Sequence, residues 1–151
     1  MQRFLSPALL LLSLAACSGG DRPRAAAFVP PALAESDFGD LRVRYNALPT
    51  LALNQAVADQ YGVKRDARNA LVVVALRQLR DGEESSADGE VELHAVDLAG
   101  ARQQVALRAV RSGDYTDHIG VVRVSAHDSY RFEARIKAGE RRETVKFQRN
   151  F

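Results

Sequence analysis

Cysteine is almost absent from this chain: Cys17 is the only one, and tryptophan is missing altogether. Without a second cysteine no internal disulfide can form, so an exported domain of this size would depend on its hydrophobic core alone. The same scarcity excludes a thiol nucleophile or a thiolate metal site in the rest of the chain. Because tryptophan and a disulfide pair are both lacking, the sequence does not describe an antibody-type immunoglobulin domain.

The sequence also lacks a long apolar run and an excess of one charge. The N-terminal apolar stretch, Phe4 to Ala16, is about 13 residues long, whereas a membrane-spanning helix needs about 20. The chain has 21 Lys and Arg against 19 Asp and Glu. Removal of residues 1–16 takes away only Arg3 among the charged side chains, which leaves about +1. That balance gives no clustered basic footprint for nucleic acid.

The N-terminus has the layout of a bacterial lipoprotein signal. Arg3 precedes the apolar stretch, and Leu14-Ala15-Ala16-Cys17 places small residues directly before the lone thiol. We predict that residues 1–16 are a cleaved signal peptide and that Cys17 receives lipid, palmitate included. The alternative is an ordinary signal peptide with a chance cysteine near its cleavage site. Ser18, rather than Asp, follows the cysteine, and resemblance to Gram-negative lipoproteins then favours the periplasmic face of the outer membrane.

Composition divides the rest of the chain into a linker and one domain. Residues 17–37 are predicted to be the lipidated cysteine and a flexible linker, because Gly19, Gly20, Pro23 and the Pro30-Pro31 pair interrupt regular structure. A linker of about 20 residues reaches at most about 70 Å, so the domain can stand clear of the membrane. Residues 38–151 are predicted to form a single folded domain with one core.

Hydrophobic patterning in that domain predicts mostly strands. Leu41 to Tyr45 alternates apolar and charged residues, as a half-buried strand does. The Val-rich run Leu71 to Leu76 predicts a central strand buried on both faces, with a buried helix as the alternative. Asn54 to Tyr61 predicts one short helix, capped by Asn54 and ended at Gly62. Further strands are predicted within Glu90–Asp97, Arg102–Arg111, Tyr115–Ser125 and Tyr130–Lys137 and around Val145–Phe147, and Arg80–Gly89 is predicted to be a polar loop.

About seven strands separated by turns roughly every ten residues predict an all-β, antiparallel sandwich or barrel. The alternation in the last hairpin points Tyr130, Phe132, Ala134 and Ile136 to one side. The residues that we expect to share one buried core are Val43, Leu71, Val73, Phe132, Ile136 and Phe147.

Short motifs in a fixed order carry a family resemblance. They are Phe38-Gly39-Asp40 with Val43-Arg44-Tyr45-Asn46-Ala47, Tyr61-Gly62-Val63-Lys64-Arg65 with Asn69-Ala70-Leu71, and Val145-Lys146-Phe147-Gln148-Arg149-Asn150-Phe151. With these motifs the chain resembles the bacterial domain-of-unknown-function family 4426 from Phe38 onward. The resemblance implies an exported, immunoglobulin-like β-sandwich. It implies no catalytic residue, because the family has no agreed biochemical activity.

Side chains that could carry chemistry are few and scattered. The three histidines, at 94, 118 and 127, show no HExxH or helical i, i+4 spacing. A site built from His118 and His127 with Asp117 would need a curled strand. No GxSxG nucleophile elbow is present. The carboxylates Glu83, Glu84 and Asp88 lie in the polar loop, where a solvated acidic surface is the simpler interpretation. We therefore predict no catalytic residue, no metal site and no cofactor.

The polar family motifs leave one binding hypothesis. Tyr45, Asn46 and Tyr61 could form one rim of a recognition surface, or Tyr45 could be a core aromatic whose hydroxyl finds a partner. The sequence favours a non-enzymatic, lipid-anchored periplasmic binding or accessory module. It is tethered through Cys17, binds no nucleic acid, and has an envelope protein or an exposed strand of one as its possible partner. The alternative is a small envelope enzyme or metal-binding protein that uses His118 and His127.

Overall fold

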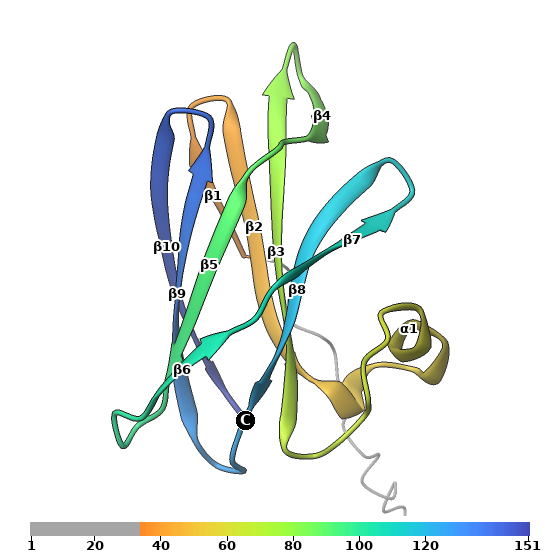
Figure 1. Cartoon of the computed structure of the whole chain (residues 1–151), viewed down its shortest axis with the longest axis vertical. Helices are drawn as coiled ribbons and strands as arrows, with labels where there is room; N and C mark the ends of the chain where they lie inside the picture. The colour runs from red at the N-terminus through yellow and green to blue at the C-terminus, as the bar shows by residue number, and fades with distance from the viewer. Residues whose placement is uncertain (1–33) are drawn as a thin grey trace, which may run out of the picture.

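The computed structural model describes residues 34–151, which form two antiparallel sheets packed face to face (Figure 1). Sheet A has the order β1-β2-β3-β8-β7, with β4 also paired to β3, and sheet B has the order β10-β9-β5-β6. The strands are β1 (Ala34–Phe38), β2 (Leu41–Pro49), β3 (Asn69–Arg80), β4 (Glu83–Ser86), β5 (Glu90–Val96), β6 (Arg102–Val105), β7 (Arg108–Ser112), β8 (Tyr115–Arg123), β9 (Ser129–Ala138) and β10 (Arg141–Asn150).

The predicted antiparallel β-sandwich with one short helix is confirmed, and the immunoglobulin-like assignment stays a prediction. In the described part of the chain no helix has the length and apolar character that a membrane crossing requires. The predicted signal peptide, Cys17 and the first part of the predicted linker lie outside the described residues.

Sheet A begins inside the stretch that the sequence assigned to the linker. β1 starts at Ala34 and pairs with β2 from Ala34 opposite Tyr45 to Phe38 opposite Leu41. Ala34 and Phe38 pack against the main core. Residues 34–37, which the sequence assigned to the linker, therefore take part in sheet A. The alternation of Ala34, Ser36 and Phe38 is short and follows a Pro- and Ala-rich stretch, so composition alone hides it.

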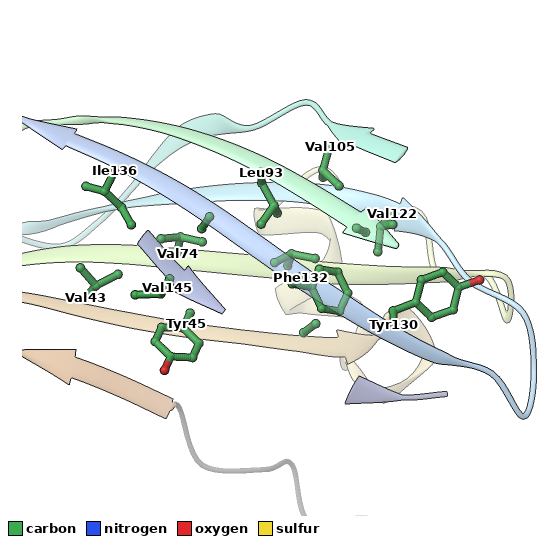
Figure 2. Packing of buried hydrophobic residues seen from close by; sticks show 14 of the residues in the cluster. Val43, Tyr45, Val74, Leu93, Val105, Val122, Tyr130, Phe132, Ile136 and Val145 are labelled. Atoms are coloured by element: carbon green, nitrogen blue, oxygen red, sulfur yellow. The ribbon is translucent and has the colours of Figure 1, made fainter. Parts of the chain in front are cut away.

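The main core lies between the two sheets (Figure 2). Val43 of β2, Phe132 of β9 and Ile136 of β9 are 0%, 1% and 2% exposed, as predicted. Phe147 of β10 is partly buried and stacks on Phe132, with ring centroids 4.8 Å apart. Tyr45 packs on the same Phe147 ring at 4.9 Å. A run of aromatic rings from both sheets thus joins the two layers.

β3 is buried on both faces, so the domain has two apolar clusters rather than one. Val72 and Val74 face sheet B and belong to the main core. Leu71 and Val73 face the other way and pack with Ile119 in a second cluster. The prediction that Leu71 and Val73 share one core with Val43 and Phe132 was therefore wrong, because they belong to the second cluster. The continuous apolar run correctly predicted a central strand, but it could not assign its residues to two different layers.

A helical segment covers the second cluster. The 3-10 turn Thr50–Ala52 leads to α1 (Gln55–Gln60). The Asn54 side chain accepts a hydrogen bond from the Val57 backbone N–H at 2.8 Å, as an N-cap residue does. Gly62 follows with φ +55°, a left-handed conformation that glycine adopts at little cost. Both predicted helix signals are confirmed.

The predicted strand Arg102–Arg111 is two strands that belong to different sheets. β6 pairs with β5 in sheet B, whereas β7 pairs with β8 in sheet A. Between them the chain crosses Gly120 of β8, where an added Cβ would lie 2.7 Å from the Ala106 carbonyl oxygen. Only glycine allows this close approach. Sequence alternation continues through the crossing, which explains why one strand was predicted.

Candidate functional site

The three predicted binding residues do not share one surface. Tyr45 is 8% exposed in the main core, and its hydroxyl lies 3.0 Å from the Ser36 hydroxyl. Asn46 is 4% exposed and its Oδ1 accepts hydrogen bonds from Arg149. Tyr61 is the C-cap residue of α1 and packs against the second cluster. Tyr45 and Tyr61 therefore lie on opposite sides of sheet A. This placement gives Tyr45 and Asn46 structural contacts and separates both from Tyr61.

The two histidines of the alternative hypothesis, His118 and His127, lie in different parts of the fold. His118 lies within β8, opposite Val74 and Ala109. His127 lies in the turn after β8, with φ +60°. The five residues from His118 to the end of β8 span about 17 Å at the usual strand rise. Within residues 34–151 no three His, Cys, Asp or Glu side chains are grouped so that they could hold a metal ion.

The predicted polar loop contributes a carboxylate to the outer face of sheet A. Glu84 lies on the short strand β4, and its Oε1 accepts hydrogen bonds from Arg42 at 2.9 Å and Arg44 at 2.8 Å. Arg42 also donates to Asp37, and this pairing lowers the pKa of the Asp37 carboxyl below its usual value. Glu84 therefore links β4 to β2 through ion pairs. Glu83 and Asp88 form no ion pair with any of the described residues.

A second ion pair on this outer face is largely buried. Arg77 is 7% exposed and donates to Asp117 Oδ1 at 2.5 Å. It also donates to the Thr116 carbonyl oxygen, and its guanidinium stacks over the Tyr115 ring at 4.5 Å. Arg42, Arg44 and Arg77 thus each have a carboxylate partner. The charge of these three arginines is therefore compensated locally.

A cleft of about 820 Å³ lies at the end of the sandwich where three hairpins meet. Two of its charged side chains, Asp40 and Arg141, are held in place by contacts within the domain. Arg141 donates to the Phe38 carbonyl oxygen and pairs with Asp40 at 2.7 Å. Gln78 also donates to Asp40, and these contacts lower the pKa of the Asp40 carboxyl. The side chains at this end therefore brace the hairpins against one another.

The outer face of sheet B differs from that of sheet A. Leu93 and Ala95 of β5 are buried, so His94 and Val96 point outward. Register places two rows of outward side chains across the four strands. The first row is Arg102, Val96, Arg131 and Gln148, and the second is Gln104, His94, Glu133 and Lys146.

Most of these side chains border a hollow of about 490 Å³, which we call the sheet B hollow. Its outward-facing lining is His94, Val96, Arg102, Arg131, Glu133, Lys146 and Gln148.

Charge in the sheet B hollow is not compensated. The side chains of Arg102 and Arg131 form no hydrogen bond or ion pair with any of residues 34–151. Glu133 is already engaged by Arg135 at 2.8 Å and Lys146 at 3.5 Å, and hydrogen bonding to Arg135 lowers the pKa of its carboxyl. His94 Nδ1 is buried without a hydrogen-bond partner among the described residues. Such atoms in native proteins usually contact water or a ligand.

One edge strand of sheet B, β10, is strongly basic. β10 runs for ten residues as an edge strand and pairs with β9. It carries four cationic side chains, Arg141, Arg142, Lys146 and Arg149. Charged residues, lysine above all, are a usual protection of edge strands against pairing with another chain. The composition of β10 therefore favours the face of sheet B over its edge as a binding surface.

The fold described above is shared with known proteins. The model of a domain of unknown function, DUF4426, matches residues 35–151. The chain belongs to the DUF4426 family. A solved DUF4426 family protein from Pseudomonas aeruginosa PAO1 has 23% sequence identity and a TM-score of 0.66, with 79% of this chain and 94% of that chain covered. The family resemblance seen in the sequence is thereby confirmed.

More distant structures share the fold of this DUF4426 protein. Copper-bound FetP, as a variant from uropathogenic Escherichia coli strain F11, has 10% identity and a TM-score of 0.57, with 81% of this chain and 96% of that chain covered. FetP of the same strain, as isolated, has 8% identity and a TM-score of 0.57, with 80% and 94% covered. At this identity the likeness concerns the fold alone. No curated protein matches the sequence.

The sequence reasoning missed the residues of the sheet B hollow. His94 and Arg131 alternate with apolar neighbours, which identifies them as outward-facing on their own strands, whereas Arg102 lies between Ala101 and Gln103. Alternation does not say which strands are adjacent. The pairing of β5 with both β6 and β9 is what brings these three side chains to one hollow.

Proposed function

We propose that this DUF4426 protein is a non-enzymatic binding or accessory module. Lipid on Cys17 anchors it to the periplasmic face of the outer membrane, and the outer face of sheet B engages another envelope component. An envelope protein is the preferred partner. The linker after Cys17 is long enough for the domain to reach such a partner away from the lipid surface.

One contrast carries the binding part of this proposal. On sheet A, Arg42, Arg44 and Arg77 each have a carboxylate partner, whereas Arg102 and Arg131, which meet at one hollow on sheet B, have none among the described residues. Exposed cations that converge on a hollow attract a partner of opposite charge and set its orientation. The support for a non-enzymatic role is the separation of His118 from His127, since a catalytic histidine must lie within hydrogen-bond reach of its nucleophile or ligand.

The anchor has a direct test. Mass spectrometry of the mature N-terminus should show an acylated cysteine at position 17, because the lipoprotein signal ends there. Cys17→Ala should release the domain from membranes on fractionation, since stable anchoring depends on the acyl chains. Ser18→Ala is the matched control and should stay membrane-bound. A free N-terminal residue at any other position would contradict the prediction.

The absence of catalysis has a genetic test. His118→Ala and His127→Ala should each leave activity within a small factor of wild type in a growth or envelope-stress assay where deletion has a phenotype. The reason is that neither imidazole takes part in a constellation with a nucleophile and an orienting group. If either variant folds and localises normally but fails to complement, the enzyme or metal-binding alternative replaces the binding module.

A further inference from the structure

We propose that the sheet B hollow receives an acidic, extended segment of a protein partner. Two carboxylates of the segment pair with Arg102 and Arg131, and an apolar side chain between them rests on Val96. This inference rests on the proposed function and names the chemistry of the partner at that same surface.

The spacing of the first row supports two separate carboxylate contacts. Arg102 and Arg131 both lie opposite Val96, one on β6 and one on β9. Neighbouring strands are about 4.8 Å apart, so the two arginine Cα atoms are about 10 Å apart. Each guanidinium presents a planar fork of donors that matches one carboxylate in a bidentate pair. The apolar side chain of Val96 lies between the two forks.

The neighbouring side chains favour an anionic partner. Lys146 lies in the row next to that of Arg131. Lys146 and Arg135 both form ion pairs with Glu133, so the one carboxylate in the lining of the hollow is already neutralised. Gln148 closes the row on β10 opposite Arg131, and its amide donates to the Ser129 hydroxyl at 2.6 Å. The ligand therefore meets two free positive charges and no free negative charge within the lining of the hollow.

The shape of the hollow favours a polypeptide over a small molecule. Small-ligand sites usually enclose most of the ligand surface. The sheet B hollow is only partly enclosed, because it lies along the face of a four-stranded sheet. An extended segment can lie across such a face, and its side chains alternate, so that every second one points toward the sheet.

The test measures binding of a labelled peptide to the mature lipidated protein in detergent micelles by fluorescence anisotropy. The probe is a seven-residue peptide with glutamate at the second and sixth positions, valine at the fourth and serine elsewhere. In extended form these three side chains face the same way. We expect binding that weakens as salt is added. Arg102→Gln/Arg131→Gln should lower the affinity by about tenfold or more, as should glutamine in place of both glutamates.

A matched pair of substitutions controls for net charge. Arg80 and Arg123 are exposed, lie off the hollow, and have side chains without hydrogen-bond or ion-pair partners among the described residues. Arg80→Gln/Arg123→Gln removes the same charge and should bind the peptide as wild type does. Equal loss in both double variants would overturn the inference. Arginine-dependent binding of inorganic phosphate, or of vesicles containing phosphatidylglycerol, that is tighter than peptide binding would overturn it as well.

Complementation separates this inference from the proposed function. If Arg102→Gln/Arg131→Gln folds but fails to complement, while no acidic peptide binds, the face is functional and the acidic segment is wrong. If that variant complements like wild type and still loses peptide binding, the hollow is not the working surface and the inference falls. In that second case the anchor and histidine experiments decide whether a binding module remains.

Discussion

Phe132→Ala should lower the free energy of unfolding by about 3–5 kcal/mol, the largest loss that we expect from one substitution in this domain. Phe132 is 1% exposed and stacks on Phe147 across the β9–β10 ladder. Truncation removes buried apolar surface and leaves a cavity that the surrounding aromatic and β-branched residues can fill only in part. Urea unfolding followed by circular dichroism measures the change.

Leu98→Ala is the control for that experiment. Leu98 is 74% exposed, so its truncation should change the stability by less than about 0.5 kcal/mol. A loss under about 1 kcal/mol for Phe132→Ala would mean that the inward face of β9 is not the one described here.

Asp117→Ala should destabilise the domain by about 3 kcal/mol or more, because it leaves the Arg77 guanidinium buried without its counter-ion. The two side chains are only 8% and 17% exposed and lie 2.5 Å apart. Arg77→Met in the Asp117→Ala background removes the stranded charge and keeps an apolar side chain of similar length against the Tyr115 ring. This double variant should therefore regain most of the lost stability.

Asp114→Ala provides the comparison for the ion pair. Asp114 is an exposed carboxylate in the β7–β8 turn, and its side chain has no hydrogen-bond or ion-pair partner among the described residues. Its loss should stay within about 0.5 kcal/mol. The buried-charge explanation fails if the Arg77→Met/Asp117→Ala variant is no more stable than Asp117→Ala alone.

Local patterns in the sequence were reliable for single elements. The alternation in Tyr130–Ile136 placed Phe132 and Ile136 in the core, and the Asn54 and Gly62 signals located the helix. These predictions succeeded because a strand's side-chain period and a helix cap depend on a few neighbouring residues. The crossing from β6 to β7 was missed because alternation continues across it, and only the partners of each half distinguish the two strands.

The predicted functional residues show the same division. Tyr45 and Tyr61 are both polar aromatics in family motifs, yet one faces the main core and the other packs by the helix. Glu84 looked like part of a solvated acidic loop and instead joins Arg42 and Arg44. Each outcome depends on which strands pair, and strand pairing is a long-range property.

By itself the sequence determined the lipoprotein signal hypothesis, the membership in DUF4426 through its ordered motifs, the all-β composition, and the absence of cysteine chemistry after Cys17. Tertiary structure alone decided that β3 has two buried faces, that Arg77 has a partner in Asp117, and that Arg102 and Arg131 meet at one hollow without partners among the described residues. The physical reason is the distance along the chain between the residues that determine each property. Composition and periodicity act over a few residues, whereas charge compensation depends on side chains brought together from strands that are distant in the chain.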